Sequence, residues 1–367
     1  MRMAVFGLTV SSSWGNGHAT LWRGLISALA RKGWQVSFFE RDVPYYRETR
    51  DLFALPGGDL ILYSSWEEVR RQAERTVAEA DVAVVTSFCP DGVAASQAVL
   101  GAGRALRVFY DLDTPVTLAA LRQGRGAPYL PPEGLSGFDL VLSYTGGAAL
   151  DELRDTLGAR RAAPLYGHVD PDQHRPGKPD AAFFGDLSYL GTYAADRQAG
   201  VERFLVEPAR LRPQSRFVIA GAQYPADFPW TDNIHFVRHL PPSDHPGFYA
   251  SSRLTLNVTR QAMAEMGWCP SGRLFEAAAC GAAILSDTWA GLETFFAPGR
   301  EILPVEGTAD VLAALDVPDE ELKRIGARAR ERVLAEHTSA RRADELIALL
   351  EASSRGASAR MPEREEA

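Results

Sequence analysis

The chain has few cysteines, no long apolar run and no excess of basic residues. Its 367 residues include only Cys89, Cys269 and Cys280, which lie too far apart for a disulfide framework or a four-ligand zinc site. The apolar run at 3–10 is short and leads into a polar Gly/Ser-rich segment, and no stretch approaches the roughly 20 apolar residues of a membrane-spanning helix. We therefore expect a cytoplasmic protein whose contact with membranes is at most peripheral.

Net charge and chain length further restrict the class of protein. The sequence contains 39 Lys and Arg against 47 Asp and Glu, a formal net charge of -8, so we do not expect a nucleic-acid partner. Apolar residues make up 46% of the chain, and the length fits two domains better than one. These values predict a globular protein with two substantial cores.

Apolar strand-like runs alternate with helical segments in both halves of the chain. In the first half we expect strands at 3–10, 35–39, 82–86, 106–110, 138–143 and 164–169, and helices at 20–31, 66–80, 92–100 and 147–157. In the second half we expect strands at 189–191, 217–220, 235–237, 254–258 and 282–286, with helices between them. This alternation predicts parallel, doubly wound sheets.

A segment rich in proline and glycine divides the two halves. Residues 170–179 read DPDQHRPGKP, which is typical of a linker. We predict an N-terminal Rossmann-like domain at 1–169, a linker at 170–185, and a C-terminal Rossmann-like domain at 186–352 whose last helix crosses back. The polar tail 353–367 is expected to be disordered. The predicted fold class is α/β, with two doubly wound parallel-sheet domains that face a ligand-binding cleft.

Residues 270–281 predict a helix whose amino terminus faces the cleft. Ser271 is its expected N-cap, Gly281 lies just past its end, and the strand 282–286 follows directly. Free backbone N–H groups at this terminus, beside Gly272, form a potential anion site.

Three side chains near this terminus suit a nucleotide. Arg273 and Arg260 can supply charge-assisted hydrogen bonds to phosphate groups. Glu276, one turn into the helix, can accept hydrogen bonds from a ribose diol. The same pattern also fits a capped core helix that carries a surface Arg–Glu pair.

Residues 274–281, LFEAAACG, resemble the glutamate-alanine-cysteine-glycine segment of GT-B glycosyltransferases, whose glutamate holds the donor ribose. Three further segments resemble the CgeB-like spore-maturation glycosyltransferases, namely YLGTY at 189–193, LNVTR at 256–260 and SDTWAGL at 286–292. The likeness extends from about Ser11 to Arg342. It implies a GT-B fold and a nucleotide diphosphate sugar held by the second domain, with Glu276 on the ribose.

The resemblance also implies which residues contact the donor. Relatives with a retaining mechanism place an arginine and then a lysine on the phosphates after the first strand of this domain, and here those positions hold Thr192 and Arg197. Tyr193 belongs to the same loop. The second glutamate of those relatives, near the transferred sugar, is replaced by Trp268, with Glu265 as a substitute if the loop differs. The stereochemical outcome therefore stays open.

The loop 11–20, SSSWGNGHAT, joins the first strand to the first helix. It resembles the glycine-histidine loop of inverting GT-B enzymes, whose histidine acts as a base on the acceptor hydroxyl, and His18 suits that role if a carboxylate supports it. Asp111 and Asp113 end the strand 106–110 and share one face by the two-residue strand period, so either can be that carboxylate. Alternatively, His18 binds its own loop or touches the donor phosphates.

The same loop permits another interpretation. Its cleft-facing tip consists of Trp14, Gly15, Asn16 and Gly17, and Trp14 can stack on a sugar there. Residues 15–20 also resemble a dinucleotide fingerprint, with Glu40 where a ribose-binding acid would lie. Its third position is Thr20 rather than glycine or alanine, which makes an NAD-dependent oxidoreductase the weaker alternative.

We expect no metal cofactor. Asp111 and Asp113 match the spacing of a metal-binding aspartate pair in the other main glycosyltransferase architecture, but a helix terminus and arginines can neutralise a leaving diphosphate instead. Five histidines show no metal-ligand spacing and are expected in loops or on the surface: His168, His174, His235, His239 and His245. His239 and Leu240 also form the turn where relatives read the nucleotide base through backbone groups.

These features together predict a metal-independent glycosyltransferase, a hexosyl or related transferase that uses a nucleotide sugar. Its acceptor is expected to be a carbohydrate, a lipid-linked molecule or another small molecule. His18 with Asp113 or Asp111 is expected to deprotonate the acceptor. Arg273, Arg197 and Arg260 are expected to stabilise the leaving diphosphate. The alternatives are a catalytically silent nucleotide- or carbohydrate-binding protein of the same fold, or a nucleotide-sugar epimerase.

Overall fold

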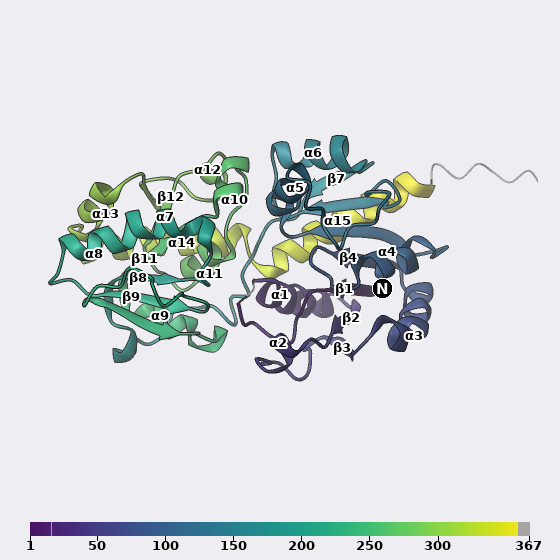
Figure 1. The fold of residues 1–367 in the computed structure, drawn as a ribbon, viewed down its shortest axis with the longest axis horizontal. Coiled ribbons are helices and arrows are strands. Elements are labelled where there is room, and N and C mark those ends of the chain that lie inside the picture. The colour runs from purple at the N-terminus through teal and green to yellow at the C-terminus, as the bar shows by residue number, and fades with distance from the viewer. Residues whose placement is uncertain (16, 359–367) are drawn as a thin grey trace, which may run out of the picture. The chain divides into compact units, whose positions relative to one another are not determined.

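The computed structural model describes residues 1–15 and 17–358 and contains two parallel β-sheets with helices packed around them (Figure 1). The chain divides into two compact units. The first comprises Met1–Ser12, Trp22–Tyr166 and the chain from Ala340, and the second comprises Ser13–Leu21 and Gly167–Ser339. The loop after the first strand, with the first turn of the following helix, is therefore grouped with the second unit.

The first unit contains a seven-stranded sheet in the order β3-β2-β1-β4-β5-β6-β7. Its strands are β1 Arg2–Gly7, β2 Gln35–Arg41, β3 Gly58–Tyr63, β4 Val82–Thr86, β5 Leu106–Asp111, β6 Leu140–Ser143 and β7 Ala162–Pro164. Its helices are α1 His18–Arg31, α2 Pro44–Arg47, α3 Trp66–Glu79, α4 Gly92–Leu100, α5 Thr114–Arg122, α6 Ala148–Leu157 and α15 Ser339–Ser358. Every residue of β4 is buried, as expected for a central parallel strand covered on both faces.

The second unit contains a six-stranded sheet in the order β10-β9-β8-β11-β12-β13. Its strands are β8 Gly185–Leu190, β9 Phe217–Gly221, β10 Ile234–Arg238, β11 Ser252–Asn257, β12 Ile284–Asp287 and β13 Leu303–Val305. Its helices are α7 Gln198–Val201, α8 Glu207–Leu211, α9 His245–Ala250, α10 Gln261–Met266, α11 Gly272–Ala279, α12 Leu292–Phe295, α13 Thr308–Leu315 and α14 Asp319–Glu336. A π-helical turn, Glu202–Val206, joins α7 to α8.

Both sheets reverse their strand order at one strand. In the first unit β1 lies between β2 and β4, and in the second unit β8 lies between β9 and β11. All of these neighbouring strands pair in parallel. Ligands of open α/β sheets bind at such switch points, outside the carboxyl ends of the strands. The loops after β1 and β8 are therefore the places to look for a site.

Two edge strands have no counterpart among the predicted elements. Strand β3 follows the turn-forming pair Pro56-Gly57 and is only partly buried, so its apolar pattern is weak. Strand β13 contains Pro304, which a sheet tolerates at its edge because the missing N–H faces away from the ladder. In both cases the strand is short, and the turn-forming residues in it or before it weaken the sequence pattern that would predict it.

The last helix extends further than the sequence predicts. Helix α15 ends at Ser358, so it covers residues 353–358 of the segment expected to be disordered, whereas residues 359–367 lie outside the described part of the chain. The hydroxyl of Ser353 donates to the carbonyl of Leu349 over 2.8 Å, which satisfies a polar side chain within the helix.

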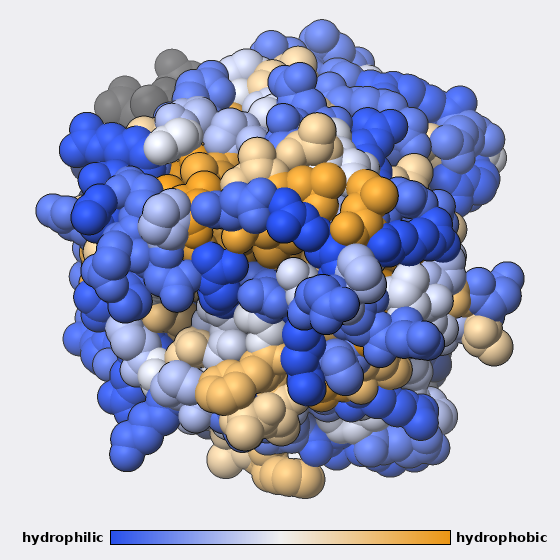
Figure 2. All heavy atoms as spheres, turned by 90° about the vertical axis from the view of Figure 1, so that its left-hand side faces the viewer, coloured by the Kyte–Doolittle hydropathy of each residue, from blue (hydrophilic) through white to orange (hydrophobic). Residues whose placement is uncertain are grey.

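One face of the molecule carries mainly hydrophilic side chains. Figure 2 shows one face on which these side chains predominate, with a band of hydrophobic ones visible between them. Exposed large apolar side chains of the second unit include Phe184, Leu211 and Phe236. No helix among the described residues is long and apolar enough to cross a membrane.

Candidate functional site

Backbone hydrogen bonds tie together the loops at the carboxyl ends of β8, β9 and β10. The N–H of Gly191 donates to the carbonyl of Ala220 over 2.8 Å, and that of His239 donates to the carbonyl of Gly221 over 2.9 Å. The Tyr224 hydroxyl donates to the carbonyl of Gly191 over 3.1 Å. These bonds fix the loops at the carboxyl ends of the strands in the second sheet, next to β8, where the strand order reverses.

Arg273 reaches from helix α11 to this carboxyl edge of the second sheet. Its Nε donates to the carbonyl of Leu190, and its Nη1 donates to Oδ1 of Asn257 over 2.9 Å. Its guanidinium carbon lies 5.0 Å from the centre of the Tyr189 ring, a cation–π distance. Among the described residues no carboxylate forms an ion pair with Arg273, so neutral acceptors position a cation that keeps its full charge.

A second arginine binds the same loop. Nη1 of Arg197 donates to the carbonyl of Thr192 over 3.3 Å, and Arg197 likewise has no ion-pair partner in the described part of the chain. Arg260 differs, because its Nε pairs with Asp196 over 2.9 Å. The ion pair with Asp196 makes Arg260 less available to a phosphate than Arg273, and its role on the donor stays a prediction.

Both unpaired arginines face Tyr224. Burial raises the pKa of the Tyr224 phenol, and the charges of Arg273 and Arg197 act in the opposite direction. Tyr193, in the same loop, packs its ring 5.7 Å from that of Tyr224 and donates its N–H to the carbonyl of Ala222 over 2.9 Å. The edge of the sheet thus gathers two cations that an anion can neutralise.

Helix α11 begins where the capping pattern predicts. Gly272 is its first residue and Ser271 is the N-cap, with an extended backbone at φ -63° and ψ 139°. The Ser271 side chain makes no capping hydrogen bond, so it leaves the first N–H groups of the helix to other acceptors.

Glu276 lies further along α11 with its carboxylate partly exposed. No hydrogen bond from a described residue reaches this carboxylate, and Nδ1 of His245 lies 3.8 Å from its Oε2. The side chain is 15% exposed. Glu276 therefore retains the capacity to accept hydrogen bonds from hydroxyl groups, which is the capacity that a ribose site needs.

Trp268 occupies a constrained position in the loop before α11. Its backbone lies in the left-handed region at φ 44°, and its N–H donates to the carbonyl of Ala290 over 2.7 Å. A Cβ added to Gly291 would come within 2.6 Å of the Trp268 ring, so the two residues are in close contact. The possible substitute Glu265 is exposed on α10 and accepts from Gln261 over 2.8 Å.

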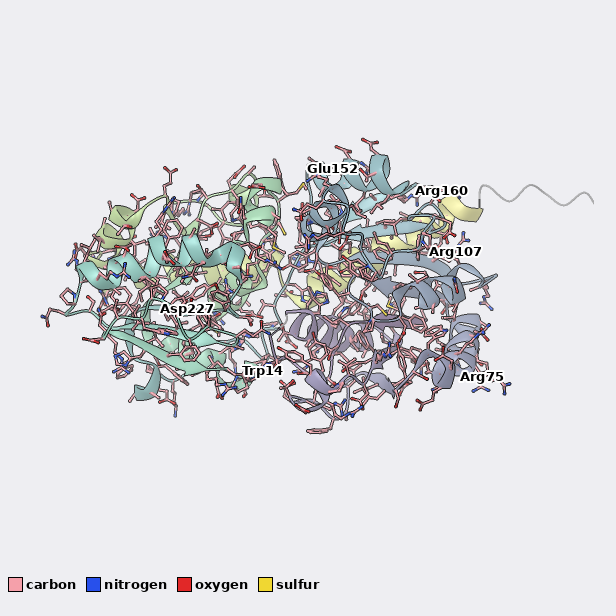
Figure 3. All side chains as sticks on the ribbon, in the orientation of Figure 1. Trp14, Arg75, Arg107, Glu152, Arg160 and Asp227 are labelled. Atoms are coloured by element: carbon pink, nitrogen blue, oxygen red, sulfur yellow. The ribbon has the colours of Figure 1, made fainter. Side chains whose placement is uncertain are left out.

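The backbone groups expected to read a nucleotide base are partly used within the protein. His239, at φ 57°, donates its N–H to Gly221, and the carbonyl of Leu240 accepts from Nε2 of His245 over 3.3 Å. The ring of His239 lies 4.2 Å from that of Trp14, which is labelled in Figure 3. Both belong to the second unit.

The glycine-rich loop leads into α1, which starts at His18. The carbonyl of Gly17 accepts from the N–H of Leu21 and the hydroxyl of Thr20, and thereby forms the first turn. Gly15 has φ 70°, a conformation that favours glycine. Asn16 lies outside the described residues. His18 is half-buried and is grouped with the second unit, whereas Asp111 and Asp113 belong to the first, so their pairing stays a prediction.

The two candidate carboxylates differ in their surroundings. Asp111 ends β5 and is fully buried, and its Oδ1 accepts from the N–H of Asp113 over 2.9 Å and from the hydroxyl of Thr117 over 3.1 Å. Asp113 is the half-buried N-cap of α5 and accepts from Ser87 over 3.2 Å. The prediction that both share one strand face is wrong, because β5 ends before Asp113. Asp113 is the more accessible of the two.

The buried carboxyl of Asp111 gives a pH-dependent stability. Burial, reinforced by the charge of Asp113, raises its pKa from 3.8 to about 7. A raised folded-state pKa means that the folded chain binds this proton more tightly, so its contribution to stability is lost as pH rises from about 4 to about 7. Asparagine does not ionise, so Asp111→Asn removes this pH-dependent loss of stability.

The melting temperature of Asp111→Asn relative to the parent should therefore rise between about pH 5 and about pH 8 in thermal melts. The exposed Asp155→Asn is the matched control and should show no such trend. A constant difference between Asp111→Asn and the parent across this range would contradict the raised pKa.

A second buried carboxylate shapes the loop after β1. Glu40 is fully buried and accepts from the hydroxyl of Thr9 over 2.8 Å and from the N–H groups of Val10 and Ser11 over 2.7 and 2.9 Å. The hydroxyl of Ser11 adds a further bond over 2.5 Å. Both carboxylate oxygens are used inside the protein, so Glu40 is not available to bind a ribose as a dinucleotide site requires.

Replacing Glu40 by glutamine should destabilise the chain strongly. The amide offers one acceptor oxygen in place of two and turns an NH2 group toward buried donors, and each hydrogen bond to a charged group contributes about 1.5–3 kcal/mol. We expect the free energy of unfolding to fall by about 3 kcal/mol in urea denaturation. Exposed Glu48→Gln should have little effect. Equal midpoints for the two variants would contradict this role of Glu40.

Two histidines lie together although the sequence gives no sign of it. His174 lies in a loop, as expected, whereas His245 begins α9; both are buried, and Nε2 of His174 is 3.0 Å from Nδ1 of His245. His168 is in a loop and His235 is exposed, both as expected, although His168 is also buried. The pair forms because α9 packs beside the segment that precedes β8, a tertiary contact that no local pattern reveals.

Comparisons with known proteins agree with the observed fold. Residues 197–348, less than half of the chain, match a family model described as glycosyl transferase-like. No curated protein sequence matches the chain.

Solved structures resemble the chain over nearly its whole length. Sucrose-phosphate synthase from Thermosynechococcus elongatus has 15% identity and a TM-score of 0.69, with 97% of this chain and 99% of that chain covered. HepE from Anabaena in complex with UDP-glucose has 12% identity and a TM-score of 0.66, with 96% and 100% covered. An alpha-glucosyltransferase in complex with UDP-glucose and DNA containing an abasic site has 12% identity and a TM-score of 0.72, with 96% and 99% covered. The predicted α/β fold with two Rossmann-like, GT-B-type domains is confirmed.

Proposed function

We propose, from the GT-B fold and the glycosyl transferase-like match of residues 197–348, that the chain is a glycosyltransferase that takes its sugar from a nucleoside diphosphate donor. The observation that carries this proposal is the charge arrangement at the carboxyl edge of the second sheet. Arg197 and Arg273 are held by neutral carbonyl and amide acceptors and have no carboxylate partner among the described residues. A diphosphate is the anion that two such cations and a helix terminus suit.

The donor is proposed to lie along α11. Its diphosphate contacts Arg197, Arg273 and the N–H groups around Gly272, and its ribose hydroxyls donate to Glu276. Three features support this assignment: the free N–H groups at the start of the helix, the unbonded carboxylate of Glu276 and its partial exposure. UDP sugars are the first donors to test, because HepE and the alpha-glucosyltransferase were both solved with UDP-glucose.

The reaction breaks the bond between the anomeric carbon and the diphosphate oxygen. Positive charge grows on the sugar carbon, negative charge grows on the leaving diphosphate, and the two arginines stabilise the latter. The acceptor oxygen forms the new bond to the anomeric carbon and loses its proton to His18, which Asp113 supports in this proposal. Arginines and helix N–H groups take the place of a metal ion, so transfer is proposed to proceed without one.

The nature of the acceptor follows from charge and resemblance. A net charge of -8 favours a carbohydrate, lipid-linked or other small acceptor over a nucleic acid. The likeness to CgeB-like glycosyltransferases favours a surface glycan. The thiols of Cys89, Cys269 and Cys280 are buried and form no disulfide among the described residues, which favours a reducing compartment such as the cytoplasm.

The remaining alternatives lead to different results with the donor alone. An epimerase would change the sugar of its donor with no acceptor present, and a silent binding protein would bind the nucleotide and leave it intact. An NAD-dependent enzyme is disfavoured, because both carboxylate oxygens of Glu40 already accept hydrogen bonds from Thr9, Val10 and Ser11.

A calorimetric screen of UDP, GDP, ADP, CMP, dTDP, their common sugars and NAD(H) tests the proposal. We expect one nucleoside diphosphate to bind with micromolar or tighter affinity, about 8 kcal/mol, equally well with and without EDTA. The matching nucleotide sugar should then release its nucleoside diphosphate on incubation with a glycan acceptor. Binding of NAD(H) alone, or of none of these compounds, would contradict the proposed function.

A further inference from the structure

A cluster of three potential metal ligands lies beside the proposed ribose site. Ligand atoms of His174, His245 and Glu276 all lie within 4.8 Å of one another. Nε2 of His174 is 3.0 Å from Nδ1 of His245, and that Nδ1 is 3.8 Å from Oε2 of Glu276. The three residues come from the segment before β8, from α9 and from α11. The fold therefore brings two imidazoles and one carboxylate to a single point.

Hydrogen bonding defines which nitrogen of His245 carries its proton. Nε2 lies 3.3 Å from the carbonyl of Leu240, which can only accept, so Nε2 carries the hydrogen. Nδ1 then presents a lone pair toward His174 and Glu276. A ligating imidazole that donates its other N–H to a backbone carbonyl is the usual outer-shell arrangement of metal sites in proteins. In the absence of a cation, the proton on Nε2 of His174 is the one hydrogen that these three side chains place between Nδ1 of His245 and the carboxylate of Glu276.

We propose that His174, His245 and Glu276 bind a divalent transition-metal ion of the zinc class, and that this ion competes with the nucleotide for Glu276. Zinc ligated by nitrogen at about 2.0–2.1 Å and by oxygen at about 2.0–2.2 Å in tetrahedral geometry has ligand atoms about 3.3 Å apart. Two of the observed separations, 3.0 and 3.8 Å, lie on either side of this value, and all three ligand atoms lie within 4.8 Å of one another. Side-chain movements that bring them to about 3.3 Å complete the site.

The chemistry of the three groups suits this class of ion. Imidazole with carboxylate is a ligand set typical of zinc, whereas Mg²⁺ and Ca²⁺ prefer oxygen ligands. When the ion binds, the ring proton of His174 moves from Nε2 to Nδ1, and no proton is released. The partly exposed Glu276 leaves a fourth position for water.

The competition rests on the proposed function, because it requires Glu276 to be the ribose ligand. A carboxylate that coordinates the ion cannot accept from the ribose diol in the same geometry. Transfer is therefore expected to need no metal and to be inhibited by zinc. The site would couple donor binding to the concentration of free zinc.

Metal binding is measured first on the full chain without nucleotide, after EDTA treatment and its removal. We expect Co²⁺ to bind with one ion per chain and to give the intense visible absorption of a tetrahedral site, which Zn²⁺ then abolishes. His174→Gln should weaken Co²⁺ binding at least tenfold. His235→Ala removes an exposed histidine and is the matched control, which should bind as the parent does. Thermal melts of each variant verify folding.

Competition is measured next by calorimetry with UDP. In the parent, Zn²⁺ should weaken UDP binding at least tenfold, and EDTA should restore it. In His174→Gln, Zn²⁺ should change UDP binding only by the amount that Zn–UDP complexes in solution explain, because that effect is common to both proteins.

The outcomes separate the two proposals. Absence of a tetrahedral Co²⁺ spectrum, or equal Co²⁺ binding by His174→Gln and the parent, would overturn the metal site and leave the donor site standing. Normal Co²⁺ binding that His174→Gln abolishes, with UDP affinity insensitive to Zn²⁺, would confirm the metal site and contradict the ribose role of Glu276.

Discussion

Replacing His18 by alanine should lower the rate of sugar transfer about 100- to 10,000-fold and leave nucleotide affinity nearly unchanged, since a positioned general base contributes that much. His18 starts helix α1, directly after the glycine-rich loop, and it is half-buried. In the proposed reaction it takes the proton of the acceptor hydroxyl, an interaction that forms as the new bond forms. The expected signature is therefore a loss in kcat without a matching loss in donor binding.

The measurement is release of nucleoside diphosphate in the presence of an acceptor that supports turnover by the parent, paired with calorimetry of the same nucleotide. His235→Ala is the control because its imidazole is exposed. Asp113→Asn should reproduce part of the loss if Asp113 supports His18, and Asp111→Asn should do so less, because Asp111 is buried. A large loss of nucleotide affinity in His18→Ala would instead assign His18 to the donor phosphates.

Replacing Glu276 by alanine should have the opposite signature and weaken nucleoside diphosphate binding about 100-fold or more. Two hydrogen bonds from the ribose diol to a carboxylate, at about 1.5–3 kcal/mol each, correspond to at least this factor. Glu265→Ala is the matched control, because Glu265 is an exposed glutamate of the neighbouring helix α10 that binds Gln261. The measurement is calorimetry with UDP or with whichever nucleotide the screen identifies.

A ligand that lacks the ribose hydroxyls gives a sharper test of Glu276. The 2′,3′-dideoxy nucleotide should bind the parent about as weakly as the normal nucleotide binds Glu276→Ala. The dideoxy nucleotide should lose little further binding free energy when Glu276 is also replaced by alanine, because both changes remove the same interaction. Additive losses, or unchanged affinity in Glu276→Ala, would contradict the ribose assignment.

The sequence predicts the donor helix well because its signals are local. An N-cap serine, a following glycine and a glycine past the end define α11 to within one or two residues. The sequence also indicates that Arg273 lies near the helix start. It does not reveal that Leu190 and Asn257 hold the guanidinium, because these partners end two other elements, β8 and β11, and only the sheet brings them to Arg273.

Predictions that depend on pairing or on exact strand ends are less accurate. Asp111 and Asp113 were expected on one strand face, but the helix after β5 starts at once and turns Asp113 into an N-cap. Arg260 was expected on phosphate, and the fold adds an ion pair with Asp196 that the sequence does not reveal. In each case a contact supplied by the fold changes the surroundings of the side chain.

The same reasoning applies to the fold as a whole. Strand–helix alternation is sufficient to predict two parallel sheets, because each crossover returns the chain to the same sheet. It fails for edge strands such as β3 and β13, which are short and contain or follow turn-forming residues. It also cannot bring His174 beside His245, since helix packing alone makes that contact.

A crystal structure of the chain with UDP bound tests the central claim most directly. We predict that the diphosphate contacts Arg197, Arg273 and the N–H groups at Gly272, and that the ribose hydroxyls lie within hydrogen-bond distance of the Glu276 carboxylate. UDP bound away from these residues, with Glu276 free of the ribose, would contradict the account.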